Sequence, residues 1–74
     1  MKNNVEKILD NKIAEYRFKN NNMSQQELAD LVGVSRQTII QLEKNRYNPS
    51  LLLAYSIAKV FKAIIEDIFI FEEE

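Results

Sequence analysis

Glycine and proline each occur only once in the 74 residues of this chain, as Gly33 and Pro49. These residue types make most tight turns and strand connections, so a chain with so few of them has little room for hairpins. Apolar residues make up 46% of the sequence, which is enough to form one hydrophobic core at this length. We therefore expect a single domain over residues 1–74 with an all-α fold.

The chain contains no cysteine and no histidine. This composition excludes a disulfide framework and removes the thiolate and imidazole ligands that zinc sites require. It also removes two common catalytic groups, so we expect neither an enzyme nor a cofactor or metal. No apolar run reaches the roughly 20 residues that cross a membrane, and the N-terminal segment lacks the apolar stretch of a secretory signal. The sequence predicts a cytoplasmic protein without a membrane partner.

The formal net charge of −1 conceals an uneven distribution of charge. Residues 1–50 carry eight Lys and Arg against six Asp and Glu, whereas residues 51–74 carry two against five. A protein that binds nucleic acid without sequence preference is usually more basic than this. The charge pattern therefore argues against a nonspecific phosphate binder and leaves room for a small basic patch.

Capping residues predict where the first two helices lie. Asn11 is a candidate cap for a helix over residues 12–20, in which we expect Arg17 to face water. The apolar face of this helix would comprise Ile13, Tyr16 and Phe18. Ser24 and Glu27 have the spacing of a capping box and would begin the second helix, which Gly33 would end in a left-handed conformation. The apolar face of the second helix would comprise Leu28, Leu31 and Val32.

Ser35 would cap a third helix, from Arg36 to Lys44, which turns Ile39 and Leu42 inward. Asn45 can adopt the left-handed conformation that ends this helix. Ser50 would cap a fourth helix over residues 51–61, and residues 63–69 could form a short fifth one.

Two segments have the composition of strands rather than helices. The run from Ile68 to Phe71 is β-branched and aromatic, which favours a short C-terminal strand. The apolar residues Val5, Ile8 and Leu9 fit either a helical turn or a strand paired with that run. The sequence leaves this choice open.

The stretch SQQELADLVGVSRQTIIQLEKNRYNPS, residues 24–50, closely resembles the helix-turn-helix of the phage Cro and repressor family. The pieces S-Q-x-E-L-A, G-V-S-R-Q-T-I, L-E and Y-N-P-S occur in the order and spacing of that family, and the resemblance extends over residues 11–69. It implies a five-helix, lambda-repressor-like domain that binds double-stranded DNA, with the helix-turn-helix at about residues 25–44. Lys62 and Ile64 depart from the pattern, because the family commonly has Gly and then Ser or Thr at these positions before its fifth helix.

The outward face of the third helix carries the residue types that read bases. Arg pairs with guanine and Gln with adenine in the major groove. By similarity to the family, Arg36, Gln37 and Gln41 occupy base-reading positions. The residues expected at the DNA backbone are Gln25, Ser35, Thr38, Lys44, Asn45 and Arg46. Glu43 would repel phosphate, so we interpret it as a structural partner of Arg17 or Arg46.

The region from about residue 51 to residue 71 has more apolar side chains than one small core should absorb. We therefore predict a homodimer and expect an approximately palindromic operator. The predicted dimer interface comprises Leu52, Tyr55, Ile64, Ile65, Ile68, Phe69 and Phe71. The open alternative is that these residues only complete the core of one chain.

These observations predict a sequence-specific transcriptional regulator, most simply a homodimeric repressor. The chain would have no room for a ligand-sensing domain, so a protein partner or its own concentration would regulate it. The alternative is the antitoxin of a toxin–antitoxin pair, which would bind its toxin through the acidic C-terminal tail and also bind its own promoter.

Overall fold

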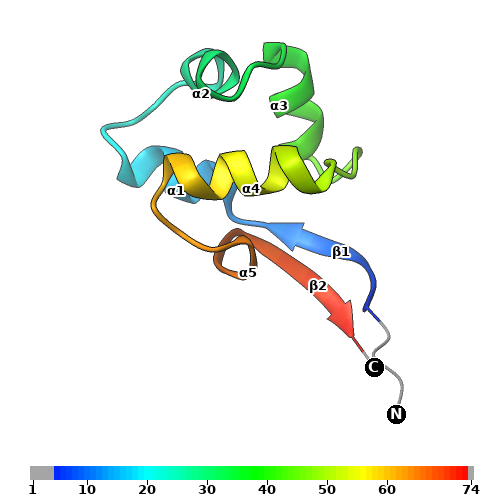
Figure 1. Ribbon diagram of the computed structural model, residues 1–74. Helices are drawn as coiled ribbons and strands as arrows, with labels where there is room; N and C mark the ends of the chain where they lie inside the picture. The colour runs from blue at the N-terminus through cyan, green and yellow to red at the C-terminus, as the bar shows by residue number, and fades with distance from the viewer. Residues whose placement is uncertain (1–4, 74) are drawn as a thin grey trace.

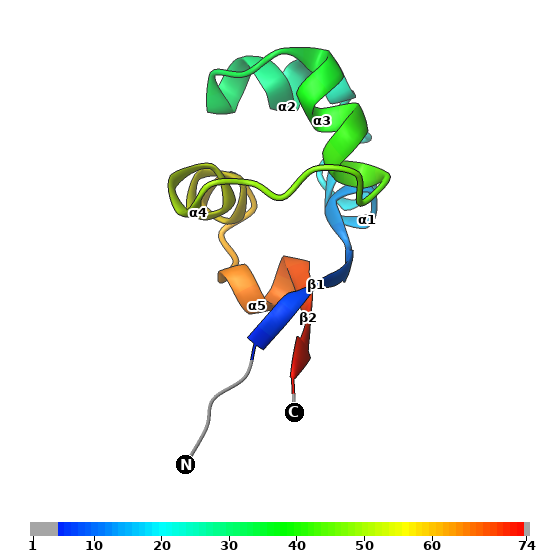
Figure 2. The same cartoon turned by 90° about the vertical axis from the view of Figure 1, so that its right-hand side faces the viewer.

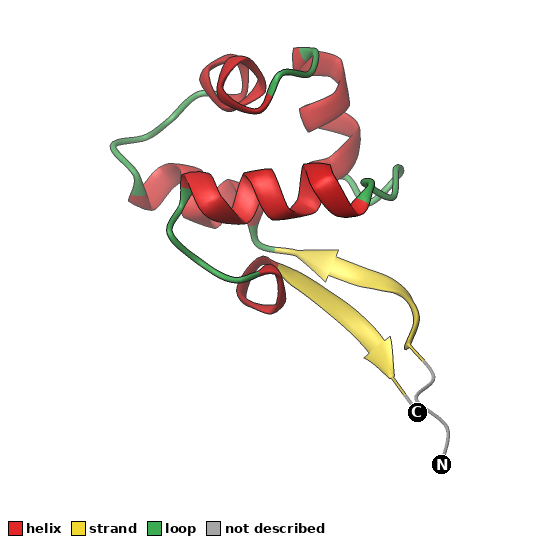
Figure 3. Ribbon diagram, viewed as in Figure 1, coloured by secondary structure: helices red, strands yellow, loops and turns green. Residues whose placement is uncertain are grey.

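A computed structural model describes residues 5–73 of the chain, and within that range five helices lie between two strands (Figures 1 and 3). The elements in chain order are β1 (Val5–Asn11), α1 (Ile13–Lys19), α2 (Gln25–Val32), α3 (Arg36–Glu43), α4 (Leu51–Val60), α5 (Ile65–Ile68) and β2 (Phe69–Glu73). Each of the five predicted helices is present. None of them is long and apolar enough to cross a membrane.

The elements form three levels, which the view in Figure 2 separates clearly. Helices α2 and α3 form the upper level, α1 and α4 lie beneath them, and α5 and the two strands form the lowest level. Helix α2 packs against both α3 and α4, and α4 packs against α5. The core runs through all three levels. It comprises Ile13, Leu28, Ala29, Ile39, Leu42, Leu53, Ala54, Ile57, Ala58, Ile68 and Phe69.

The predicted starts of α2, α3 and α4 are confirmed by the hydrogen bonds of their caps, whereas the N-cap of α1 is Lys12 rather than the predicted Asn11. Ser24 Oγ accepts from the backbone N–H of Glu27, and the Glu27 carboxylate accepts from the N–H of Ser24, which completes the capping box. Ser35 and Ser50 cap α3 and α4 in the same way, each accepting from the N–H three residues later. At the other end of α2, Gly33 has a φ of 76°, the left-handed conformation that glycine adopts without steric cost.

The predicted all-α class is wrong in one respect, because the two ends of the described chain form an antiparallel sheet. Strand β1 pairs with β2 in a register that places Ile8 opposite Phe71 and Asn11 opposite Phe69. The open question about residues 5–9 is thereby resolved in favour of a strand. Ile8 and Phe71 both pack against the core, so apolar burial on one face of the sheet stabilises the pairing.

Three side-chain orientations differ from those expected. Arg17 was expected to face water but is buried. Phe18 and Leu31 were expected on the buried apolar faces of their helices, but their side chains are 60% and 61% exposed. In α2, Ala29 takes the inward position beside Leu28, because the small side chain lets neighbouring elements approach closely. In α1, an ion pair with Glu43 of α3 holds the Arg17 side chain inward. The side chain of the next residue, Phe18, points outward.

Helix α5 is shorter than predicted, with four residues from Ile65 to Ile68. It has no side-chain cap at Ile64, but the Asp67 carboxylate accepts a hydrogen bond of 3.1 Å from the Ile64 N–H. Lys62, which stands where the family commonly has glycine, has a φ of 55°. The chain therefore adopts a left-handed conformation at this position without glycine, the residue that suits it best.

Ile68 and Phe69 were predicted to lie at a dimer interface, and the structure corrects this. Their exposed fractions are 0% and 2%, because Ile68 is turned beneath α4 and Phe69 begins the buried face of the sheet. Both residues belong to the core of a single chain. The other predicted interface residues remain accessible to some degree.

Candidate nucleic-acid interface

Helices α2 and α3 are joined by a short turn that the sequence determines residue by residue. The Gly33 and Val34 N–H groups donate to the Ala29 carbonyl at 2.9 and 3.0 Å, and Ser35 then caps α3. Ala29 of α2 and Ile39 of α3 are both fully buried. The turn and the shared core hold the two helices as one rigid unit, with one face of α3 left open.

The open face of α3 carries the predicted base-reading residues. Arg36 and Gln37 are exposed in the first turn, and Gln41 is half-buried one turn later. Gln37 and Gln41 line a shallow hollow that also includes Ser35, Thr38, Arg46 and Tyr47. Because Ile39 and Leu42 point into the core, the polar residues between them are directed away from it. The structure thus brings the three predicted residues onto one helix face.

Lys44 and Arg46 are exposed where α3 ends. Asn45 between them has a φ of 58°, as its role in ending the helix required. The backbone turns sharply there, since the Arg46 N–H donates to the Gln41 carbonyl at 3.0 Å. These two cations therefore flank the C-terminal end of the α3 face, while Arg36 lies at its other end.

Two of the predicted DNA-backbone residues are already engaged with one another. Ser35 Oγ accepts from the Thr38 N–H at 3.1 Å and lies 3.0 Å from Thr38 Oγ1. One of the two hydroxyls donates to the other, so only the remaining hydroxyl hydrogen is free for a further acceptor.

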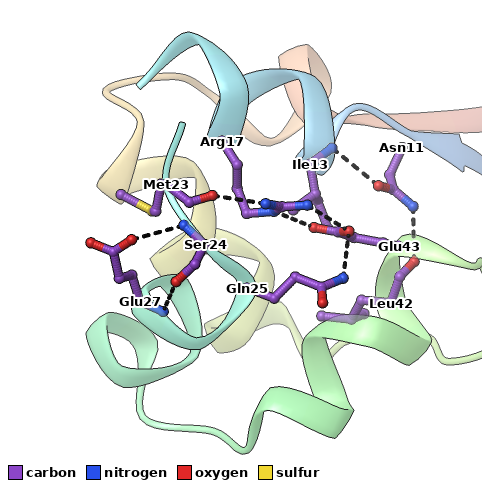
Figure 4. Close-up of polar contacts among 9 residues, drawn as sticks. All are labelled: Asn11, Ile13, Arg17, Met23, Ser24, Gln25, Glu27, Leu42 and Glu43. Atoms are coloured by element: carbon purple, nitrogen blue, oxygen red, sulfur yellow. Dashed lines mark hydrogen bonds and ion pairs between the residues drawn. The ribbon is translucent and has the colours of Figure 1, made fainter. Parts of the chain in front are cut away.

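Gln25, at the start of α2, is also engaged within the chain (Figure 4). Its Nε2 donates to Glu43 Oε1 at 3.0 Å, which orients the amide toward the C-terminal end of α3. An amide nitrogen carries two hydrogens, and one of them is not used in this contact. Gln25, which is predicted to bind a DNA phosphate, is thereby held in a fixed orientation, and one of its N–H groups is not used in this contact.

The main partner of Glu43 is Arg17 of α1. The Arg17 guanidinium donates to both Glu43 oxygens and, through Nη1, to the Met23 carbonyl at 2.7 Å (Figure 4). Of the two partners predicted for Glu43, Arg17 is therefore confirmed and Arg46 is not. The burial of Arg17 was missed because helical spacing alone places it beside other charged residues, and only a buried carboxylate far along the chain shows otherwise.

A second polar cluster joins β1 to the end of α3, and nothing in the sequence indicates it beyond the presence of two asparagines. Asn11 Nδ2 donates to the Leu42 carbonyl and to Asn45 Oδ1, and Asn45 Nδ2 donates to Asp10 Oδ1. The hydrogen bond from Asn45 and, second, one of 2.8 Å from the Asn11 backbone N–H to Asp10 Oδ1 lower the pKa of Asp10 below its ordinary value of 3.8. Asp10 is therefore an anion beside the predicted DNA-backbone residue Asn45.

Two short helices joined through a left-handed glycine, the second of them presenting Arg and Gln on an open face, define a helix-turn-helix domain. Residues 13–64 match the family model described as helix-turn-helix. The chain belongs to this family, in its Cro/repressor-like branch.

Full-length relatives agree with this assignment. The chain is 65% identical over 63 residues to an HTH-type transcriptional regulator of Archaeoglobus fulgidus, covering 85% of this chain and 87% of that protein. It is 55% identical to one of Methanocaldococcus jannaschii, covering 86% and 96% of the two chains. It is 48% identical to one of Bacillus subtilis, again covering 86% and 96%.

Proposed function

We propose that this protein is a transcriptional regulator that binds double-stranded DNA in a sequence-specific manner and reads the major groove with α3. The observation that carries the proposal is the division of α3 into two faces. Ile39 and Leu42 are buried, and Arg36, Gln37 and Gln41 lie on the open side. Membership of the helix-turn-helix family and the description of its relatives as transcriptional regulators support the same conclusion.

The proposed base contacts follow from the chemistry of each side chain. The Arg36 guanidinium would donate two hydrogen bonds to O6 and N7 of a guanine, and the amides of Gln37 and Gln41 would pair with N6 and N7 of adenines. Each good bidentate pair contributes about 1 to 3 kcal/mol of discrimination against the wrong base. Three such residues on one helix are sufficient to specify a short half-site.

Contacts to the DNA backbone would fix the register of α3 in the groove without carrying sequence information. We assign this role to residues at the start of α2 and at both ends of α3, namely Gln25, Ser35, Thr38, Lys44, Asn45 and Arg46. Gln25 is the best supported of them, since Glu43 holds its amide in place and one N–H remains for a phosphate oxygen. The N-terminal end of α2 adds a favourable dipole to that contact.

Selection of bound sequences from a random DNA pool, followed by affinity measurements on the selected site, tests the proposal. Replacing Gln37 by Ala should relax the preference at one position in each half-site, at a cost of about 1 to 3 kcal/mol on the selected site and little on random DNA. Replacing Gln25 by Ala should weaken binding to both DNAs alike. Equal losses on both DNAs for Gln37→Ala would remove the assignment of base reading to α3.

We further propose that the regulator is a homodimer and acts as a repressor on an approximately palindromic operator. The supporting observation is an exposed apolar surface, which we call the α4 surface, made by Leu52, Tyr55 and Ile64. Ile65 and Phe71 are half-buried and would contribute edges to it. A two-fold dimer would place two copies of α3 about 34 Å apart, one turn of DNA.

Sedimentation at micromolar concentration tests the dimer. Ile64→Glu should give folded monomers that bind the selected operator far more weakly. Leu31→Glu is the matched control, because Leu31 is as exposed as Ile64 but lies on α2, outside the α4 surface. A wild-type monomer, or equal dissociation by both substitutions, would contradict this assignment.

The antitoxin alternative remains a hypothesis without a supporting observation. Its acidic segment overlaps β2, which is paired with β1, and Glu72 lies 3.8 Å from Lys7 across the sheet. A toxin would have to bind those residues while they are paired. No feature of the described residues favours this role over DNA binding, so we propose the regulator.

A further inference from the structure

Asn11 lies where the terminal sheet meets the end of α3. It is the last residue of β1, opposite Phe69 in β2, and its side chain crosses to α3. Its Nδ2 donates to the Leu42 carbonyl at 2.9 Å and to Asn45 Oδ1 at 2.8 Å, as Figure 4 shows for Leu42. Residue 11 precedes the segment matched by the family model, which begins at residue 13.

The Leu42 carbonyl is one of the four at the end of α3 that have no partner within the helix. It accepts from the Asn45 N–H at 3.0 Å and from Asn11 Nδ2, so both of its lone pairs are used. Asn11 therefore supplies, from a distant strand, the second hydrogen bond to the Leu42 carbonyl at the C-terminal end of α3.

Asn11 is itself fixed at several points. Its Oδ1 accepts from the Ile13 N–H at 3.1 Å, and the N–H of the next residue, Lys12, donates to the Ile68 carbonyl at 2.7 Å. Ile68 is fully buried. The contact with Leu42 thus connects α3 to the start of α1 and to the buried end of α5.

We infer that Asn11 is a positioning residue for DNA recognition, which holds the C-terminal end of α3 at a fixed place relative to the terminal sheet. The inference rests on the proposed function, because it assigns to α3 the reading of bases. Gln41, Lys44 and Arg46 lie in the same part of the helix or directly after it. Base contacts require side chains within hydrogen-bond reach, so movement of this end of α3 reduces binding to the operator more than binding to random DNA.

The substitution Asn11→Ser separates this contact from the other roles of Asn11. A serine hydroxyl still accepts from the Ile13 N–H, as Ser does at caps, but it is too short to donate to the Leu42 carbonyl or to Asn45 Oδ1. The substitution leaves the net charge unchanged, so nonspecific attraction to phosphate stays the same. Asn20→Ser is the matched control, since Asn20 is exposed and has an ordinary negative φ.

Amide hydrogen exchange of the free protein measures the contact without DNA. We expect Asn11→Ser to reduce protection at least about fivefold at the N–H groups of Lys44, Asn45 and Arg46, because both hydrogen bonds from Asn11 Nδ2 are lost and one such bond is worth about 1 kcal/mol, or about fivefold. Protection at Ile57, in the middle of α4, should stay unchanged. Asn45→Gly keeps the left-handed backbone and removes the other partner of Asn11, and it should have a smaller effect of the same kind.

Affinity measurements on the selected operator and on random DNA provide the second readout. Asn11→Ser should lower operator affinity about 5- to 10-fold, equivalent to about 1 to 1.4 kcal/mol, with random-DNA affinity unchanged. A purely stabilising residue would leave the ratio of the two affinities unchanged well below the melting temperature. Asn20→Ser should change neither affinity.

Unchanged protection at residues 44–46 in Asn11→Ser overturns the inference whatever the DNA result. Reduced protection with an unchanged ratio of affinities overturns the positioning role. A wild-type protein that prefers no sequence overturns the proposed function instead, so the two failures are distinguishable.

Discussion

The guanidinium of Arg17 and the carboxylate of Glu43 form a two-point ion pair between α1 and α3. Arg17 Nε lies 2.6 Å from Glu43 Oε2, and Nη2 lies 3.0 Å from Oε1. The side chains are only 8% and 12% exposed. Gln25 donates to the same carboxylate. The pair therefore determines how α3 packs on α1 and also where the Gln25 amide, which we propose binds a phosphate, lies.

Breaking this pair should strongly destabilise the fold. Arg17→Met leaves the Glu43 carboxylate buried without its cation, and we expect a loss of about 3 to 5 kcal/mol in the free energy of unfolding. Urea denaturation measures the loss. Glu72→Gln is the control, because the Lys7–Glu72 pair is exposed and should contribute at most about 1 kcal/mol. Similar losses of unfolding free energy for the two variants would show that the buried pair stabilises the fold no more than the exposed one.

Ala29 should tolerate no larger side chain, since it is fully buried in α2. Ala29→Leu should cost about 1 to 3 kcal/mol by overpacking, and DNA binding should fall with stability. The control on the same helix is Leu31→Ala, which should change stability by at most about 0.5 kcal/mol. Thermal unfolding of the two variants checks this, and an unchanged melting temperature for Ala29→Leu would contradict the packing described for α2.

Replacing Lys62 by glycine should stabilise the protein. Its φ of 55° is a conformation in which a side chain is strained, so Lys62→Gly should raise the free energy of unfolding by about 0.5 to 1 kcal/mol. Lys59→Gly, three residues earlier in the last turn of α4, should lower it by about 0.5 to 1 kcal/mol. Opposite shifts in melting temperature are expected, and shifts of the same sign would count against strain at Lys62.

Because the pKa of Asp10 is lowered in the folded protein, its contribution to the free energy of unfolding depends on pH. The folded-state pKa lies below 3.8, so the contribution is fully present above that value and is lost as the pH falls through the folded-state pKa. Compared with Asp10→Asn, the wild type should therefore lose stability on acidification below about pH 4, whereas the difference should be constant from about pH 5 to pH 7. Urea denaturation at these pH values measures it. A difference that does not change in acid would exclude a lowered pKa.

Salt should weaken DNA binding by a moderate amount. The exposed cations on or beside α3 are Arg36, Lys44 and Arg46, and a proposed dimer would neutralise roughly 6 to 8 phosphates in total, which gives a slope of log K against log salt near −5 to −7. Arg46→Gln should make the slope less steep by about 2 in a dimer, one unit for each chain. A wild-type slope near zero would be incompatible with contacts to phosphate.

The local features of the fold were predictable because each depends on residues close together in the sequence. The caps at Ser24, Ser35 and Ser50 and the left-handed Gly33 follow from rules that act over three or four positions. The α3 face followed from helical periodicity once two residues were assigned to the core. The positions of these elements therefore agree with the sequence to within one or two residues.

The features that escaped prediction all depend on partners far apart in the chain. The burial of Arg17 depends on Glu43, and the role of Asn11 depends on Leu42. The pairing of β1 with β2 had been one of two open alternatives, because short apolar segments fit either structure. The inward position of Ile68 likewise follows from the packing of α5 beneath α4, which composition alone does not indicate.

The pairing of β1 with β2 also constrains the order in which the protein folds. Its partners are about 60 residues or more apart along the chain, so closing the sheet costs more chain entropy than forming any of the helices between them. During synthesis β1 precedes all five helices and has no partner until residues 69–73 have been added. The helices can associate earlier, but the end of α3 acquires its contact with Asn11 only as the last strand is added. A chain that ends before residue 69 would therefore carry a helix-turn-helix in which the C-terminal end of α3 lacks its contact with Asn11, and the proposed recognition of an operator would be incomplete until β2 has been made.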